Sequence, residues 1–378
     1  MKRYKRLLLA CAAVIAVTGS ASAKDYRWSQ WQPDNESTVI ANRWFLDELK
    51  KQTKGEISFE VFSGGVLMPP RSHLQGIGDG VVQGGQVTGG YTPSDLPLTN
   101  ALTGFGFIEP DPTAIGAAYA DWAMHDPAGN KEWTSKNIVP LAGFSTPTYP
   151  IICNTAEPVR TLDQFKGKKI RWPGGASAKM TQDLGAVAVN IPAPEIYQAL
   201  QTKQVDCAGI LAGYLNIDAK LEEVSKSTTL IKAGGSFISP QIAFNSGFWK
   251  GLTDEQRSTI FKLAARTHAK LQIFYTAADE KALKTAQSHG HIVVEPEASL
   301  RHAIDKWVAD GVGDMAGVAK TTYGVKDPDA LFASFRPYVK KWHDLVAKMK
   351  DKNDEEELTK VLYDNMFADL NPATYGIK

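Results

Sequence analysis

The chain lacks the short motifs that carry much of enzyme chemistry. It contains no glycine-rich phosphate loop, no His-Glu-x-x-His helix and no Gly-x-Ser-x-Gly nucleophile turn. Its seven histidines are scattered, and only His289 and His291 lie close together in the sequence. A metal there would need further ligands, so we expect a surface loop instead. The sequence therefore predicts a protein that is not an enzyme and that uses no cofactor.

Long apolar runs are also scarce, and the main one lies at the N-terminus. Residues 1–23 begin with four basic side chains, continue with an apolar run and end in Ala-Ser-Ala, which is typical of a secretory signal peptide cleaved after Ala23. A lipoprotein site at Cys11 is the alternative, although only four apolar residues precede that cysteine. No later run approaches the roughly 18 residues of a membrane span. We therefore expect a periplasmic protein.

Cysteine is rare, and neither sign of charge dominates. After cleavage only Cys153 and Cys207 would remain, either as a disulfide formed on export or as two separate buried thiols. Four of the 42 basic residues lie in the leader, so 38 would face 41 acidic residues, a net charge of −3. This balance argues against nucleic acid as a partner. The remaining length is sufficient for two domains with cores of their own.

The first part of the mature chain alternates between strand and helix patterns. Trp28 falls within the first expected strand and is expected in the core, whereas Trp31 comes at its end and could line a cleft. Asp34 and Ser37 are candidate caps of the first helix. The expected elements are strands at 24–32, 57–62 and 84–88, helices at 37–51 (with Ile40, Trp44, Phe45 and Leu49 on one face) and 72–77, and a crossing loop at 104–112. This rhythm predicts an α/β fold with a doubly wound sheet.

The stretch from Asp163 to Gly209 is the most informative part of the chain. The elements expected within it are strands at 168–172, 186–191 and 205–209 and helices at 176–184 and 194–203. Arg171 comes near the end of the first of these strands. Open α/β sheets bind ligands in the crevice at the carboxyl ends of their strands, so this arginine is expected to face a crevice.

The sequence motifs of this stretch resemble those of a known family. It reads Asp-Gln-Phe-Lys-Gly from Asp163, Lys-Ile-Arg-Trp-Pro-Gly from Lys169, Leu-Gly-Ala from Leu184, Glu-Ile-Tyr-Gln-Ala-Leu-Gln from Glu195, and Val-Asp from Val205. These motifs, in this order, resemble those of the solute-binding proteins of TRAP (tripartite ATP-independent periplasmic) transporters, the family associated with dicarboxylate uptake. The resemblance is densest over about 160–210 and extends more loosely to about residue 290.

The resemblance implies a two-lobed periplasmic binding protein of the type II-like class, with a ligand cleft between the lobes and a long helix spanning both. It places 24–148 and 237–278 in lobe I, and 149–236 and 279–378 in lobe II. The residues themselves support the long helix, because Thr253 and Gln256 form a capping box and no Pro or Gly follows until Gly290. Two helices separated by a break near Tyr275 are the alternative.

In the resembling family the arginine of this motif, here Arg171, holds the ligand carboxylate. A guanidinium can do so through two parallel hydrogen bonds, although a structural salt bridge is the alternative role. Sialic-acid-binding members carry an arginine and an asparagine where Ile151 and Ile210 stand, so sialic acid is not expected. The candidate ligand-binding residues are Arg171, Trp172, Trp31, Thr88, Gly89, Tyr91, Ile151, Ile210, Tyr214 and Gln241.

The resemblance also implies a function and partners. The chain is expected to be a monomer that binds a small organic acid anion and delivers it to the TRAP permease subunits in the membrane. The aromatic side chains among the candidate binding residues favour a ligand that carries one carboxylate on an apolar or aromatic body. A C4-dicarboxylate is the alternative ligand, and an exported enzyme or the input domain of a sensory system is the alternative function.

Overall fold

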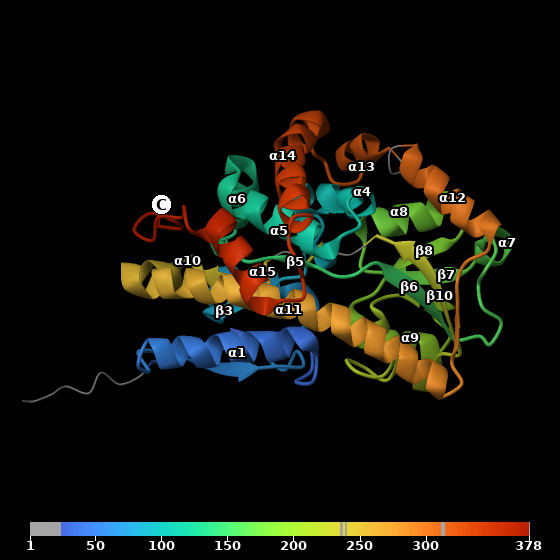
Figure 1. Cartoon of the computed structure of the whole chain (residues 1–378), viewed down its shortest axis with the longest axis horizontal. Coiled ribbons are helices and arrows are strands. Elements are labelled where there is room, and N and C mark those ends of the chain that lie inside the picture. Colours follow the sequence, from blue (N-terminus) through green and yellow to red (C-terminus); the bar gives the residue numbers. More distant parts are fainter. Residues whose placement is uncertain (1–23, 235–236, 239, 311–313, 378) are drawn as a thin grey trace, which may run out of the picture.

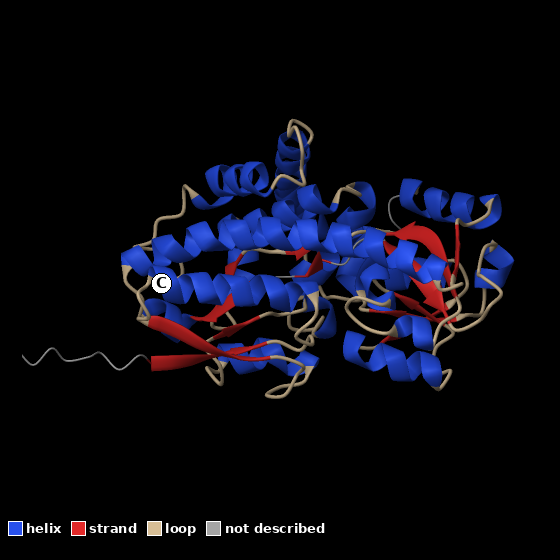
Figure 2. Ribbon diagram, turned by 60° about the horizontal axis from the view of Figure 1, so that its bottom comes forward, coloured by secondary structure: helices blue, strands red, loops and turns tan. Residues whose placement is uncertain are grey.

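The protein has two α/β lobes placed side by side (Figure 1). The computed structural model describes residues 24–234, 237–238, 240–310 and 314–377, so the expected signal peptide lies outside the described residues. Each lobe contains its own sheet and its own buried apolar cluster. Helices cover both sheets, and the two groups of strands stand apart in Figure 2. The expected two-lobed fold class is confirmed.

The first lobe is built on a mixed five-stranded sheet. Its order is β2-β1-β3-β12-β4, with β1, β2 and β3 parallel to one another and β12 antiparallel to β3 and β4. Strands β1 and β3 end earlier than expected from the apolar pattern. The strands are β1 (Lys24–Ser29), β2 (Ile57–Phe62), β3 (Gly84–Gly85), β4 (Ile138–Leu141) and β12 (Ile242–Asn245).

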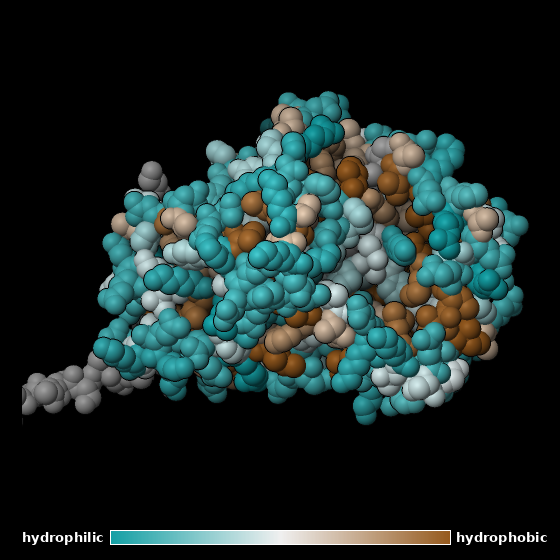
Figure 3. All heavy atoms as spheres, in the orientation of Figure 1, coloured by the Kyte–Doolittle hydropathy of each residue, from teal (hydrophilic) through white to brown (hydrophobic). Residues whose placement is uncertain are grey.

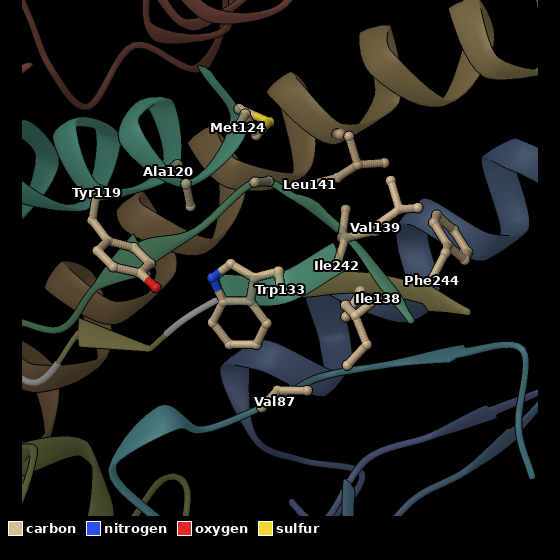
Figure 4. Close-up of a cluster of buried hydrophobic side chains, with 14 of the residues drawn as sticks. Val87, Tyr119, Ala120, Met124, Trp133, Ile138, Val139, Leu141, Ile242 and Phe244 are labelled. Atoms are coloured by element: carbon tan, nitrogen blue, oxygen red, sulfur yellow. The ribbon is translucent and has the colours of Figure 1, made fainter. Parts of the chain in front are cut away.

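A large apolar core joins this sheet to its helices. Trp28 is buried in it, as expected, and Figure 4 shows how side chains from α5, α6, β4 and β12 converge with Val87, which follows β3; among them are Trp133 and Phe244. Burying each such aromatic side chain contributes about 1.5–3 kcal/mol. The helices of this lobe are α1 (Ser37–Gln52), α2 (His73–Gly78), α3 (Pro97–Ala101), α4 (Phe105–Ile108), α5 (Pro112–His125), α6 (Pro127–Thr134), α10 (Ser246–Lys250), α13 (Met315–Thr321), α14 (Pro328–Val346) and α15 (Glu355–Leu362).

The C-terminal helices α13–α15 belong to this first core, and the assignment of all of 279–378 to lobe II is therefore wrong for this part. Trp342 is fully buried and its indole donates to Asp121 of α5 at 2.8 Å. On α15, Glu355 pairs with Arg266 and Lys270 at 2.6 and 2.8 Å. An amphipathic helix buries its apolar face, but its sequence pattern does not tell which lobe that face covers.

The second lobe holds a six-stranded sheet that carries the motif strand. Its order is β13-β10-β6-β9-β7-β8. Cys153 and Cys207 lie directly opposite each other in antiparallel strands β6 and β9 and form a disulfide. The strands are β6 (Tyr149–Cys153), β7 (Lys169–Trp172), β8 (Val187–Asn190), β9 (Cys207–Gly209), β10 (Ser227–Ala233) and β13 (Ile292–Val294), and the helices are α7 (Leu162–Phe165), α8 (Gly175–Asp183), α9 (Ile196–Gln201) and α12 (Ala298–Ala309).

The lobes are linked by a short ribbon and by one long helix. Antiparallel strands β5 (Phe144–Ser145) and β11 (Phe237–Ile238) pair at the crossing. Helix α11 (Asp254–Ser288) is continuous for 35 residues, begins at the expected Thr253 capping box and spans both lobes in Figure 1. The break considered near Tyr275 does not occur. Among the described helices, none combines the length and apolar character needed to cross a bilayer.

Three local expectations differ from the structure. Helix α1 is capped by Glu36, whose carboxylate accepts from the Thr38 amide at 2.7 Å, whereas Asp34 pairs with Arg43. Ile40 is 47% exposed, because it does not lie on the buried face of α1. The expected loop at 104–112 contains helix α4. On the face shown in Figure 3 polar residues predominate and the apolar ones form separate patches.

Candidate ligand-binding site

Arg171 is the only fully buried arginine among the described residues, and its bonding is unusual. Its side chain is 0% exposed. Nε donates to the Ile191 carbonyl at 2.7 Å, Nη1 to the Gly209 carbonyl at 3.0 Å and Nη2 to the Tyr91 hydroxyl at 3.4 Å. No carboxylate of the described residues pairs with it. A guanidinium has five N–H donors, so one N–H on each terminal nitrogen is left over.

One free N–H on each terminal nitrogen is the number of donors that a bidentate fork requires. A carboxylate is bound bidentately when two parallel N–H groups of one guanidinium reach its two oxygens. A buried charge without a counter-ion is also costly, and an anionic ligand would remove much of that cost. The alternative role of Arg171 as one half of a structural salt bridge has no partner in the part of the chain that the structure describes.

An aromatic wall from the first lobe stands against Arg171. Tyr91 follows β3 in a short 3₁₀ turn, and its buried hydroxyl also accepts from the Ala193 amide at 2.9 Å. Burial raises the pKa of the Tyr91 phenol, and the nearby Arg171 charge opposes that rise. The Trp31 ring lies 5.8 Å from the Tyr91 ring, and its indole donates to Thr88 at 3.2 Å. These four sequence-predicted residues are therefore brought together.

Further bonds join the two lobes beside this wall. Arg71 of the first lobe donates to the Tyr91 carbonyl at 2.8 Å and to the Asn190 side chain of the second at 2.8 Å. A Cβ on Gly90 would lie 2.6 Å from the Pro173 carbonyl, so this approach of backbone to backbone requires glycine. The lobes are thus closed on each other around Arg171.

A buried acidic cluster lies at the same interface. Glu36 of the first lobe accepts from the Tyr275 hydroxyl of α11 at 2.8 Å, and Ser37 donates to Asp218 of the second lobe at 3.5 Å. Burial, and then the neighbouring Asp218 charge, raises the pKa of Glu36; burial also raises the pKa of Asp218. Asp279 of α11 has its pKa raised to about 7 by burial. The closed form therefore favours protonated carboxyls here.

Ligand affinity is expected to fall as the pH rises from about 5 to about 8. Opening the lobes would separate Glu36 from Asp218 and return them toward ordinary carboxyl pKa values of about 4. The closed form then binds more protons than the open one. Low pH favours closure, and this advantage is lost as the pH passes the raised pKa of Glu36, about 8. Each extra proton that the closed form binds changes the dissociation constant of the ligand by up to about tenfold per pH unit.

Calorimetric titrations with one acid ligand across this pH range check the expectation. Asp218→Asn keeps the shape and removes the charge, so its affinity should depend less on pH and should exceed that of the wild type at pH 8. A wild-type affinity that is constant over the range would contradict the argument. The other titratable groups facing the pair are Tyr214, Tyr275 and Asp279.

The remaining predicted site residues are more dispersed. Tyr214 is buried, and Glu36, Asp218, Tyr91 and Tyr149 lie near enough to its phenol to raise its pKa further than burial alone does. Ile151 and Ile210 are buried around Gly209, the residue whose carbonyl holds Arg171. The Gly89 carbonyl accepts from Asn100 at 3.1 Å.

Trp172 and Gln241 have contacts directed away from Arg171. Trp172 is fully buried and stacks on Tyr149 with ring centroids 6.3 Å apart. Gln241 donates to Asn42 of α1 at 3.2 Å. Sequence reasoning missed the carbonyls of Ile191 and Gly209, which carry no side-chain signal, and the acidic cluster, whose members are far apart in the chain.

A family model described as "Bacterial extracellular solute-binding protein, family 7" matches residues 28–315, well over half of the chain. The chain belongs to this family. The resemblance to the solute-binding proteins of TRAP transporters, inferred from the sequence motifs around Arg171, is thereby confirmed. Members of the family are binding proteins that work in transport.

Individual relatives of this family 7 protein are distant. A solute-binding protein of Albidiferax ferrireducens is 25% identical over 227 residues, which cover 59% of this chain and 64% of that relative, slightly under two thirds of its length. A TRAP periplasmic solute-binding protein of Bordetella bronchiseptica, solved with bound (R)- and (S)-mandelate, is 23% identical with a TM-score of 0.70 over 84% of this chain and 99% of the other. One from Rhodoferax ferrireducens with copurified benzoate is 19% identical with a TM-score of 0.72, covering 85% and 99%. At this identity the two structures establish the common fold.

Proposed function

We propose that this family 7 protein closes its two lobes on a small organic acid anion, holds the carboxylate with Arg171 and delivers the anion to TRAP permease subunits. One observation carries the proposal. Arg171 is fully buried, is held by three neutral acceptors and has two N–H groups left over, with no acid among the described residues to pair with it. A bound carboxylate would satisfy both donors and the charge.

The surroundings support one carboxylate on an apolar or aromatic body. Tyr91 provides ring surface beside the guanidinium, Trp31 continues that surface, and Tyr214 lies near Tyr91. A second carboxylate reaching the Tyr214 region would approach Asp218, which is ionised above its raised pKa of about 6 and then disfavours another negative charge. This repulsion favours a monocarboxylate over a C4-dicarboxylate. The mandelate and benzoate of the two solved relatives are monocarboxylates of this kind.

The other residues of the proposed site surround this centre. Thr88 and Gly89 would form its first-lobe side, and Ile151, Ile210 and Trp172 its second-lobe side, with Gln241 at the edge of the first sheet. We place the lobe boundaries near 148 and 237, where β5 and β11 pair. The leader at 1–23 would direct the chain to the periplasm with cleavage after Ala23. There we expect it to act as a monomer without nucleic acid, cofactor or metal.

A thermal-shift screen against organic acids tests this function. A ligand present at 100 times its dissociation constant stabilises the folded state by about 2.7 kcal/mol, which raises the melting temperature measurably. We expect monocarboxylates with apolar or aromatic bodies to give the largest shifts, and matched amides or alcohols to give none. A chain stabilised by neutral or cationic compounds but by no carboxylate would contradict the proposal.

A further inference from the structure

A pair of buried glutamines lies at the edge of the first sheet where its parallel strands end. Strands β1 and β3 are neighbours in register Ser29 to Gly85, and Gln32 and Gln86 follow their ends. The Gln32 amide donates to the Gln86 side-chain oxygen at 2.7 Å. The carboxyl edge of an open α/β sheet is the edge that binds ligands. The two amides therefore occupy the ligand-facing edge of this lobe.

The pair is continuous with the wall around Arg171. Gln32 directly follows Trp31, and Gln86 precedes Thr88 by two residues. Trp31 and Thr88 are hydrogen-bonded to each other, and the Trp31 ring contacts Tyr91, which reaches Arg171. A ligand whose carboxylate meets Arg171 and whose body lies along Trp31 would have its far end directed toward these amides.

The pair leaves one acceptor and one donor unused. Gln32 is 1% and Gln86 0% exposed, yet the Gln32 Oε1 and Gln86 Nε2 atoms have no hydrogen-bond partner within the described ranges. Buried polar groups are nearly always paired, so an unpaired set calls for a reason. Reversing both amides exchanges the roles of the two residues but leaves the same free donor and acceptor. The imbalance therefore does not depend on how either amide is oriented.

One functional group matches this set better than others. A hydroxyl can donate to the free oxygen and accept from the free N–H at the same time. A carboxylate can only accept, so it would leave the amide oxygen facing a negative charge, and a methylene can do neither. We propose that Gln32 and Gln86 bind a hydroxyl group of the ligand, so that the transported anion is a hydroxylated carboxylate. This inference rests on the proposed function of Arg171.

The neighbouring glutamine, Gln30, provides a matched control. Gln30 lies at the same edge and is equally buried, but its side-chain oxygen accepts from Asn42 of α1 at 2.9 Å, and Asn42 in turn accepts from Gln241. The Gln30 oxygen is therefore tied to the helix behind the sheet, whereas its Nε2 has no partner within the described residues; unlike the pair, Gln30 offers a lone donor and no free acceptor. Gln30→Met removes a buried amide from the same edge without touching the pair, and it should leave the preference for a hydroxyl unchanged.

Calorimetry with matched acids tests the inference. The pairs are 3-hydroxyphenylacetate and phenylacetate, and 4-hydroxybutyrate and butyrate, in which only a hydroxyl distant from the carboxylate differs. In the wild type we expect at least one hydroxylated acid to bind about 10- to 100-fold more tightly than its partner. Gln86→Met and Gln32→Met should reduce that ratio to within about threefold while leaving the affinity for the partner acid nearly unchanged.

The outcomes separate this inference from the proposed function. Equal affinities within every pair in the wild type, or a ratio that survives in both Gln32→Met and Gln86→Met, would overturn the hydroxyl subsite alone. Loss of the ratio in Gln30→Met as well would assign it to general damage at the sheet edge and would also overturn the subsite. A wild type that binds none of the carboxylates would overturn the proposed function, and this inference with it.

Discussion

Arg171→Ala is expected to lower ligand affinity by about 30-fold to several thousand-fold, equivalent to about 2–5 kcal/mol. The substitution removes both N–H groups that are free to bind a carboxylate and leaves that carboxylate buried without a partner. Arg171→Lys keeps the charge but loses the planar fork, so its affinity should lie between those of the wild type and Arg171→Ala. Isothermal calorimetry with an acid found in the screen measures all three.

The control for this series must lie close to Arg171 in the sequence without sharing its site. Lys168 immediately precedes β7 and is half-buried, and no hydrogen bond of its side chain is recorded in the described part of the molecule. Lys168→Ala should therefore bind as the wild type does. Because Arg171 also anchors two backbone carbonyls, circular dichroism should confirm that each variant folds. Tyr91→Phe, which removes one hydroxyl contact of the guanidinium, gives a milder second perturbation.

An affinity of Arg171→Ala within threefold of the wild type would contradict the site assignment, provided that the variant is folded. Arg171 would then be a structural residue that holds the Ile191 and Gly209 carbonyls together. The predicted order of affinities, wild type above Lys above Ala, distinguishes a carboxylate fork from a simple positive charge. A point charge would make Arg171→Lys equal to the wild type.

The sequence predicts most clearly what depends on neighbouring residues. The capping box at Thr253 and the absence of Pro and Gly through Ser288 predicted a continuous α11, because helix initiation and interruption are local properties. The strand that carries Arg171 was likewise evident from Pro173 and the glycines after it. Their boundaries shifted by one or two residues only.

Contacts between distant parts of the chain could not be read in this way. Glu36 and Asp218 approach each other only when two lobes close, and the carbonyls that hold Arg171 belong to residues whose side chains carry no chemical signal. The C-terminal helices show the same limit. They were assigned to the second lobe, but their place on the first lobe depends on partners such as Asp121. Tertiary packing decided each of these cases.

The pairing of Cys153 and Cys207 was left open by the sequence, and its removal is expected to have the largest effect on stability. The two cysteines are separated by 54 residues, and closing a loop of that length restricts the unfolded chain by about 4 kcal/mol in the chain-entropy model. The double variant Cys153→Ala, Cys207→Ala should therefore unfold at lower denaturant concentration. The transition to follow is that of the second lobe, whose sheet contains both β6 and β9.

A reducing agent provides the matched comparison for this experiment. Reductant should shift the unfolding midpoint of the wild type toward that of the double Ala variant and should leave the variant unchanged. Ligand affinity should change little, because β9 stays paired with β7 as well as β6, so the Gly209 carbonyl remains against Arg171. Mass spectrometry that finds two free thiols in protein purified from the periplasm, or a wild-type midpoint insensitive to reductant, would contradict the stabilising disulfide.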